Sequence, residues 1–307
     1  MAKVLVTGAG GLLGASLWRA LAAAGDDVVG CTTSASTPLA VAGGKRHAIR
    51  LPDSTFARIV AEERPDWVLH CAGASSVDAS FRDPGRDFTD NVAVTECVLR
   101  SLAETRPETR MALFSSAAVY GETSSVPADE ESPTRPISPY GFHKLMAETL
   151  CREYRASFGV PTCILRISSA YGPGLRRRIL WDVYKRSLAR GPVMLEGTGR
   201  EVRDLIHVDD VVCAVRAMMG GTGWSESPIN VASGQPITIE RAARMMLDAL
   251  GSTSELRFGN EPRRGDPERS QVDVSALRAL GVSCRTTIEA GIEGYVRWLR
   301  AEAGDQG

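Results

Sequence analysis

A glycine-rich turn directly after the first predicted strand constrains the fold more than any other feature of the sequence. The segment Lys3–Thr7 predicts a β-strand, and residues 12–24 predict a helix. Three glycines at GxxGxxG spacing join them: Gly8, Gly11 and Gly14. The first permits a tight turn, the second lets a pyrophosphate approach the backbone, and the third lets the helix pack closely on the sheet. We therefore expect a dinucleotide at the N-terminus of this helix.

Predicted strands alternate with predicted helices through the first half of the chain. Further apolar strand patterns occupy Asp27–Thr32 and residues 66–71, 111–116 and 163–167. Short strands separated by helical patterns of about 10–15 residues are typical of βαβ units with right-handed crossovers. The sequence therefore predicts an α/β protein whose Rossmann-like, doubly wound parallel sheet is formed by residues 1–170.

The alternation becomes less regular after Tyr171, where glycine and proline are frequent. Helical patterns continue at residues 180–189, Val208–Met219, Ile239–Leu250 and 288–301. We predict that residues 171–307 form a smaller, mainly C-terminal substrate-binding lobe. Part of the region 205–235 is the candidate for a return to the first domain.

Composition excludes several classes of protein. The net charge of -1 gives no reason to expect nucleic acid or an acidic membrane as a partner. The basic clusters at residues 175–178 and 263–264 are candidates either for binding one phosphorylated ligand or for ordinary solvated surface. The seven cysteines form no CxxC pair, and the four histidines never fall at metal-ligand spacing. We therefore expect free thiols, no metal site and a cytoplasmic protein, without a signal peptide or a membrane span.

Residues 140–144 contain a YxxxK motif on a predicted helix. Tyr140 and Lys144 share one helix face, so the lysine ammonium can favour the phenolate form of the tyrosine. Such a tyrosine suits acid–base work in an alcohol–ketone interconversion. Ser116 ends a predicted strand, where its hydroxyl could bond the reacting oxygen. These three residues are our candidate catalytic set.

Taken together, six segments resemble the extended short-chain dehydrogenases/reductases of the nucleotide-sugar epimerase/dehydratase family. They are residues 7–14 (TGAGGLLG), 114–121 (FSSAAVYG), 138–144 (SPYGFHK), 165–173 (LRISSAYGP), 202–210 (VRDLIHVDD) and 263–266 (RRGD). They occur in the family's order and extend over nearly the whole chain.

The resemblance implies roles for individual residues. Ser116, Tyr140 and Lys144 would be catalytic, and Tyr140 and Lys144 would also contact the cofactor. The other cofactor-binding residues would be Gly8, Gly11, Leu12, Leu13, Gly14, Thr32, Thr33, Ser34, Leu51, Asp53, Ala72, Gly73 and Asn91. The substrate, a nucleotide-sugar, would contact Ser75, Ser76, Ser116, Ser169, Arg203 and Arg263. Family members commonly form homodimers through the helices that correspond here to residues 88–102 and 140–156.

The end of the second predicted strand bears on the choice of cofactor. An acidic residue there normally binds the adenosine ribose 2′-hydroxyl of NAD(H). This chain has Thr32, Thr33 and Ser34 instead, whose hydroxyls could bond a 2′-phosphate without repelling it. NADP(H) is therefore favoured, with NAD(H) as the alternative. Arg50 also stands where relatives often have an aspartate near the adenine.

Two departures from the family pattern bear on the reaction. Dehydratases of the family carry an acidic pair, and decarboxylases a glutamate, where this chain has Ala117 and Ala118. Alanine cannot transfer a proton, so dehydration and decarboxylation are disfavoured. Ser169 stands where an asparagine often meets the diphosphate of the nucleotide-sugar, which weakens the expected grip on that group.

Three functions remain. Reduction of a 4-keto (6-deoxy) nucleotide-sugar is favoured, because the second predicted strand lacks the acidic residue that would repel the 2′-phosphate of NADPH. A nucleotide-sugar 4-epimerase that retains NAD is the alternative. A cofactor-sensing protein without catalysis is the third, disfavoured by the intact set Ser116, Tyr140 and Lys144.

Overall fold

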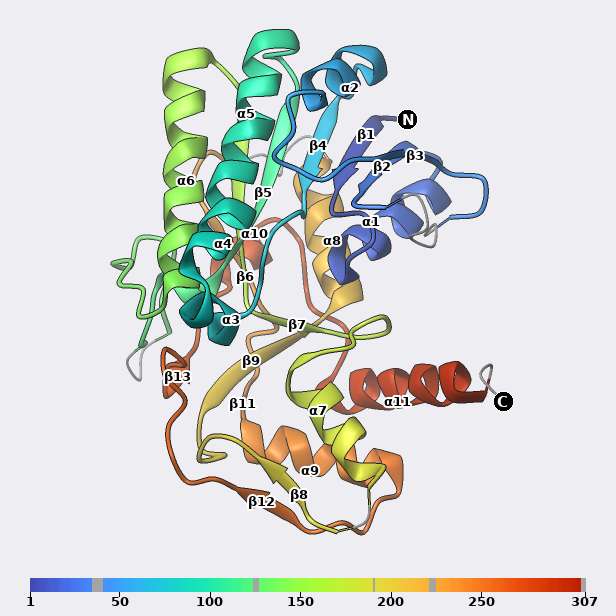
Figure 1. Cartoon of the computed structure of the whole chain (residues 1–307), viewed down its shortest axis with the longest axis vertical. Helices are drawn as coiled ribbons and strands as arrows, with labels where there is room; N and C mark the ends of the chain where they lie inside the picture. The colour runs from blue at the N-terminus through green and yellow to red at the C-terminus, as the bar shows by residue number, and fades with distance from the viewer. Residues whose placement is uncertain (35–40, 124–126, 190, 221–224, 305–307) are drawn as a thin grey trace.

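The computed structural model describes residues 1–34, 41–123, 127–189, 191–220 and 225–304. A seven-stranded sheet forms the centre of this part of the chain, with the strand order β10-β6-β5-β4-β1-β2-β3 (Figure 1). All neighbouring strands of this sheet run parallel. The strands are β1 (Lys3–Thr7), β2 (Asp27–Thr32), β3 (Lys45–Ala48), β4 (Trp67–His70), β5 (Arg110–Ser116), β6 (Thr162–Ile167) and β10 (Ile229–Val231).

Helices cover both faces of the sheet, which confirms the predicted doubly wound α/β class. One face packs against α1 (Leu12–Ala23) and α8 (Val208–Met219), which contact each other. The other face packs against α2 (Phe56–Glu63), α5 (Val94–Thr105) and α6 (Pro139–Phe158). Two separate apolar cores result, one on each side of the sheet. Such a sheet presents the carboxyl ends of its strands as a common edge for ligands.

Short elements connect the strands near this edge. They are α3 (Val77–Arg82), α4 (Pro84–Phe88), the π-helical turn η1 (Thr89–Ala93), the 3₁₀ turn η2 (Ala117–Val119) and β7 (Ser169–Tyr171). Asp83 begins α4 by accepting the backbone N–H of Arg86, and Ser138 begins α6 by accepting that of Gly141. Both are ordinary N-cap residues with proline at the next position.

A second, smaller group of elements lies below the sheet in Figure 1. Its helices α7 (Arg178–Ser187), α9 (Ile239–Leu250) and α11 (Ile288–Gly304) enclose a third apolar core. Its short strands are β8 (Val193–Leu195), β9 (Val202–His207), β11 (Pro236–Thr238), β12 (Leu256–Phe258) and β13 (Arg269–Ser270). This lobe is built from several separate segments of the chain. Three elements between these segments pack on the central sheet or its helices: α8 packs on α1, β10 joins the sheet, and α10 (Ser275–Ala279) contacts β10.

The predicted strands match β1, β2, β4, β5 and β6 to within about one residue at each end. The edge strand β3 was not predicted, because its sequence KRHA is charged and lies partly in solvent. Cysteines at all seven positions are free. Within the described ranges no helix is long and apolar enough to cross a membrane, and no cluster of three metal-ligating side chains occurs.

Candidate active site

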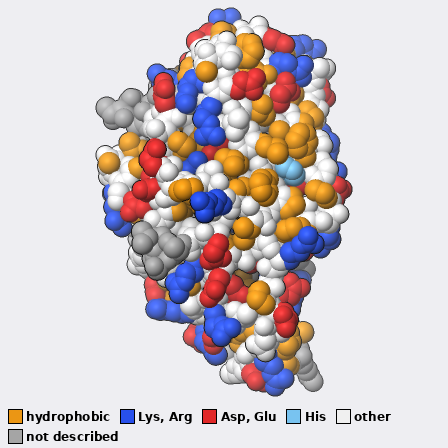
Figure 2. Space-filling view, turned by 90° about the vertical axis from the view of Figure 1, so that its left-hand side faces the viewer, with side chains coloured by type: hydrophobic (Ala, Val, Ile, Leu, Met, Phe, Trp, Pro, Cys, Tyr) orange, Lys and Arg blue, Asp and Glu red, His pale blue; other side chains and the backbone are white. Residues whose placement is uncertain are grey.

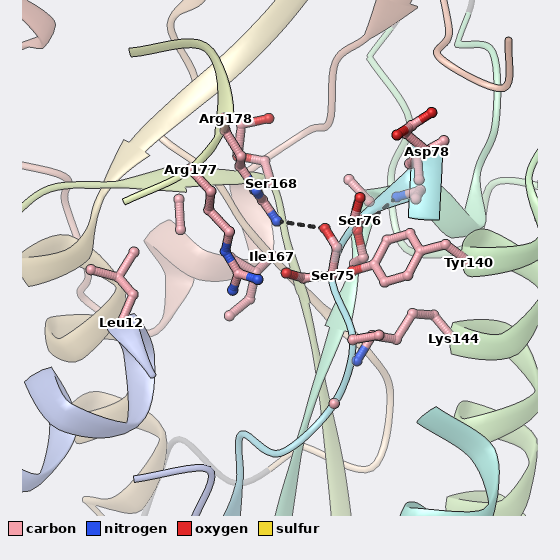
Figure 3. A pocket seen from close by; sticks show the side chains of 18 of the residues that line it. Leu12, Ser75, Ser76, Asp78, Tyr140, Lys144, Ile167, Ser168, Arg177 and Arg178 are labelled. Atoms are coloured by element: carbon pink, nitrogen blue, oxygen red, sulfur yellow. Dashed lines mark hydrogen bonds between the residues drawn. The ribbon is translucent and has the colours of Figure 1, made fainter. Parts of the chain in front are cut away.

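A cavity of about 1100 Å³ lies at the carboxyl ends of the sheet strands, between the sheet and the smaller lobe. Figure 3 shows Tyr140 and Lys144 projecting toward this cavity from α6, with Ser75, Ser76 and Arg177 on the neighbouring segments. The structure brings most of the predicted site residues to its wall. These are Gly8, Gly11, Leu12, Leu13, Gly14, Thr32, Thr33, Ala72, Gly73, Ser75, Ser76, Ser116, Tyr140, Lys144, Ser169, Arg203 and Arg263.

The glycine turn is packed too tightly for any side chain. Gly8 has φ of +65°, and an added Cβ would lie 2.7 Å from the backbone nitrogen of Ala72. A Cβ on Gly14 would lie 2.4 Å from the carbonyl oxygen of Gly8. Gly11 caps α1 without a side chain, and no acidic residue stands in the first turn of that helix. The turn therefore offers an anion free backbone N–H groups and the positive end of a helix dipole, as a bound pyrophosphate requires.

Lys144 is buried, with 7% of its surface exposed, and lies behind Tyr140 on α6. Its Nζ donates to the carbonyl oxygen of Phe114 at 3.1 Å and lies 5.9 Å from the centre of the Tyr140 ring. Nearby, Asn91 donates through Nδ2 to the Asp87 carbonyl, but its buried Oδ1 has no partner. A Cβ on Gly73 would lie 2.9 Å from that oxygen and 3.4 Å from Lys144 Nζ. This bare backbone beside an orphaned acceptor and an ammonium suits a ligand rich in hydroxyls, such as a ribose.

Ser116 ends β5 and projects at the start of η2. Its Oγ accepts the backbone N–H of Ala118 at 3.2 Å, which leaves its own hydroxyl hydrogen free for a ligand. Ala117 and Ala118 follow it in the cavity wall. No carboxylate therefore stands at the two positions where the family's dehydratases carry acids, as the sequence indicated.

A smaller cavity of about 180 Å³ lies around the end of β2. Thr33 borders both cavities, and Leu51 and Arg50 line only the smaller one. These positions suit the adenosine end of a dinucleotide. Among the predicted residues, Ser34 and Asp53 border neither cavity, and Asp53 accepts the N–H and Oγ1–H of Thr55 at the start of α2. Asn91 also borders neither cavity. Its Oδ1 lies next to the backbone of Gly73, and Gly73 lines both cavities.

His70 connects β1 to α5 through the side chains of Thr7 and Thr95. Its Nδ1 lies 2.8 Å from Thr7 Oγ1, and its Nε2 lies 3.2 Å from Thr95 Oγ1. Burial, assisted by the charge of Lys144, lowers the pKa of His70 to about 3, so the ring is neutral at physiological pH. No pattern in the sequence indicates this role, because His70 lies in an apolar strand far from its partners along the chain.

A buried ion pair holds α6 against the sheet one turn beyond Lys144. Glu148 Oε1 accepts the Ser115 hydroxyl at 2.6 Å, and Oε2 accepts Arg166 Nη2 at 2.8 Å. Arg166 Nη1 also donates to the Tyr120 hydroxyl at 2.8 Å. Because Tyr140, Lys144 and Glu148 share one face of α6, this pair holds that face of the helix beside Ser115 and the adjacent Ser116.

The residues predicted to bind the substrate differ in their hydrogen-bond and ion-pair partners. Ser76 Oγ caps α3 by accepting the Ala79 N–H, whereas Ser75 Oγ is buried without a partner. Arg203 is only 8% exposed and is paired with Asp266, and Arg263 lies 3.4 Å from Glu196. Both arginines are therefore charge-balanced in the absence of ligand.

Two arginines of the 175–178 cluster line the large cavity, and sequence reasoning did not place them there. Arg177 and Arg178 border it, whereas Arg176 turns outward to Glu302 and Trp298. Arg178 donates to the Ser75 carbonyl at 3.1 Å and has φ of +68°, a left-handed conformation that costs a non-glycine residue energy. The only sequence signal was the run of three arginines, which is as common on plain surface.

The family model that matches this chain extends over residues 4–232 and describes the NAD-dependent epimerase/dehydratase family. The chain belongs to this family. A UDP-glucose 4-epimerase from Mycolicibacterium smegmatis is 29% identical, over 97% of this chain and 98% of the relative. A dTDP-glucose 4,6-dehydratase from Streptomyces griseus is also 29% identical, over 96% and 93%.

Solved structures of family members have the same fold throughout. The UDP-glucose 4-epimerase from Thermus thermophilus in complex with NAD superimposes with a TM-score of 0.88 at 28% identity, over 97% of this chain and 99% of the other. The UDP-glucose 4-epimerase from Thermotoga maritima with UDP-glucose has a TM-score of 0.89 at 25% identity, over 98% and 99%. The extended short-chain dehydrogenase resemblance and the Rossmann-like fold are thereby confirmed.

Proposed function

We propose that this protein is a nucleotide-sugar 4-epimerase that uses NAD without net consumption. The proposal rests on one observation: Ser116, Tyr140 and Lys144 line a single cavity, and Ala117 and Ala118 stand in its wall where dehydratases carry acids. This set supports oxidation and reduction at one carbon and no elimination. The family's epimerases and the NAD complex of one of them support the choice of reaction and cofactor.

Bound NAD would supply the acceptance and return of a hydride at the sugar carbon. The glycine turn and the N-terminus of α1 would hold its pyrophosphate, and Lys144 with the Gly73 backbone would hold its ribose. Tyr140 would take the proton of the C4 hydroxyl and later return it, and Ser116 would donate a hydrogen bond to the same oxygen. Lys144 would stand behind the phenol, with its Nζ 5.9 Å from the centre of the Tyr140 ring.

Epimerisation also requires the sugar to present its opposite face before reduction. A cavity of about 1100 Å³ exceeds the space that a drug-sized ligand fills, which is about 300–1000 Å³. This volume supports the binding of both a dinucleotide and a nucleotide-sugar, with room for the sugar to turn.

Reduction of a 4-keto-6-deoxy nucleotide-sugar is the second candidate. Thr32 and Thr33 line the cavity at the end of β2, where an acidic residue would repel the 2′-phosphate of NADPH. That observation favours NADPH, which supports net reduction. The same catalytic residues would serve either reaction.

A homodimer is part of the proposal. Phe88 on α4 and Phe142 and Met146 on α6 are each at least 43% exposed. Figure 2, which views the molecule from the side of these helices, shows hydrophobic side chains gathered on that face. A second copy of the chain could cover them by pairing α5 and α6 with their equivalents, as we expected for residues 88–102 and 140–156.

The test combines an absorbance assay at 340 nm with chromatography. The protein is incubated with UDP-linked and dTDP-linked hexoses and NAD, and separately with their 4-keto-6-deoxy forms and NADH or NADPH. We expect a new sugar epimer without a net change in absorbance. Stoichiometric loss of NADPH would instead establish the reductase, and Tyr140→Phe is the control that should abolish either result.

A further inference from the structure

Arg177 is the cation of the cavity wall that has no partner. Figure 3 shows its side chain directed into the cavity on the side of Ser75 and Tyr140. Within the described parts of the chain it makes no hydrogen bond or ion pair. Each of the other arginines in the cavity wall contacts a carboxylate, a carbonyl oxygen or an aromatic ring. Arg82 pairs with Asp78, Arg178 with the Ser75 carbonyl, Arg203 with Asp266 and Arg263 with Glu196, while Arg264 stacks on Phe81.

Among the described residues, no carboxylate forms an ion pair with Arg177. Burial in the wall lowers the pKa of Arg177, and the neighbouring Arg178 lowers it further. The Tyr140 phenol opposes this lowering of the Arg177 pKa, in keeping with the position of Arg177 on the side of the cavity that holds Tyr140 (Figure 3). Arg177 also caps α7 without a side-chain hydrogen bond, and the first turn of that helix has no acidic residue. A desolvated guanidinium without an anion is costly, so the anion has to arrive with the ligand.

The opposite wall holds a second unused polar group. Ser75 Oγ is buried and has no hydrogen-bond partner, although its residue lines the same cavity. The Ser75 carbonyl is fixed by Arg178 at 3.1 Å, so this segment is tied to the loop that carries Arg177. A carboxylate between them could accept two parallel hydrogen bonds from the guanidinium and one from the serine hydroxyl.

We propose that Arg177 and Ser75 bind a carboxylate on the sugar ring, so that the substrate is a nucleotide-linked uronic acid rather than a neutral hexose. This inference rests on the proposed function, because it specifies the sugar on which Tyr140 acts. In the proposed function the glycine turn holds the pyrophosphate of the cofactor, and Arg203 and Arg263 are the expected partners of the substrate's diphosphate. A charge beside Tyr140 therefore belongs to the sugar.

The test compares two substrates that differ only in charge: a nucleoside diphosphate hexose and the matching uronic acid, each with uridine or thymidine. The variant is Arg177→Gln, and the matched control is Arg176→Gln, which lies one residue away on the same loop outside the cavity wall. Hydrogen bonds to a charged group are worth about 1.5–3 kcal/mol, or roughly 10- to 150-fold. We expect Arg177→Gln to lower kcat/KM for the acid by at least tenfold more than for the hexose, and Arg176→Gln to leave the ratio unchanged.

Binding measurements separate this inference from the proposed function. Calorimetry on Tyr140→Phe with NAD measures affinity for both sugars without turnover, and an at least tenfold preference for the acid that Arg177→Gln removes would support the inference even if no epimer forms. Equal affinity for acid and hexose would overturn it. So would a loss of affinity for NAD alone in Arg177→Gln, because Arg177 would then belong to the pyrophosphate of the cofactor.

Discussion

Replacing Glu148 with glutamine should destabilise the protein strongly while changing few atoms. Glu148 is fully buried, and its partner Arg166 is only 3% exposed. Burial opposes the charge on Arg166, but Glu148 outweighs it and raises the pKa of the guanidinium. A guanidinium does not lose its proton in a protein, so Arg166 stays charged after the substitution and is left without its anion. Removing one partner of such a pair costs about 3–5 kcal/mol.

The size of the effect on the melting temperature follows from the length of the chain. With an unfolding entropy of roughly 2.1 cal/mol/K per residue, a 307-residue chain should melt about 5–8 °C lower. Thermal unfolding followed by tryptophan fluorescence measures this. Turnover should also fall, because Glu148 fixes Ser115 beside Ser116, the residue that we propose bonds the reacting oxygen.

A double-mutant cycle tests the reasoning behind the number. Arg166→Met alone should be costly, since it leaves the buried Glu148 carboxylate with only the more distant Arg152, 3.9 Å away. The double variant Glu148→Gln/Arg166→Met should be more stable than the sum of the single effects predicts, by about 2 kcal/mol or more. A loss below about 1 kcal/mol in Glu148→Gln, or strict additivity, would refute the claim that the pair is coupled.

Three further predictions follow from other parts of the molecule. Gly14→Ala should abolish NAD binding in a fluorescence titration, because its Cβ would lie 2.4 Å from the Gly8 carbonyl oxygen; unchanged affinity would contradict the packing of the turn. Glu63 is buried, which opposes its charge, but Lys45, His47 and Lys3 outweigh this and lower its pKa to about 2. Its stabilising contribution is therefore complete above about pH 4.5 and lost as the pH falls toward 2, so the melting-temperature difference between wild type and Glu63→Gln should shrink over that window and not elsewhere. Phe142→Glu should shift the protein from dimer to monomer in analytical ultracentrifugation, whereas Phe158→Glu, at the far end of α6, should shift it less.

Much of the central sheet could be predicted from the sequence because its signals are local. The segment from Lys3 to Gly14 combines an apolar strand, a glycine turn and a helix start, and each confirms the others. Tyr140 and Lys144 are four residues apart on one helix, so their shared face follows from helix periodicity alone. β3 was missed because it is a charged edge strand whose conformation depends on pairing with β2.

The rest of the site depends on contacts between distant segments. Asn91, His70 and Glu148 obtain their roles from partners on other elements, and no spacing in the sequence indicates those partners. Arg176 and Arg177 are adjacent in one basic run, yet one faces Glu302 and the other faces the cavity. Arg177 has an extended backbone, with φ of -164° and ψ of 175°, and successive side chains of an extended chain point to opposite sides.

An isotope measurement tests the central claim most directly. The protein would be incubated with NAD and a nucleotide-sugar that carries deuterium at C4, and the recovered sugars would be analysed by mass spectrometry and NMR. If Ser116, Tyr140 and Lys144 support oxidation and re-reduction at one carbon, the new epimer should retain the deuterium at C4. An epimer that has exchanged this deuterium for solvent hydrogen would contradict the account.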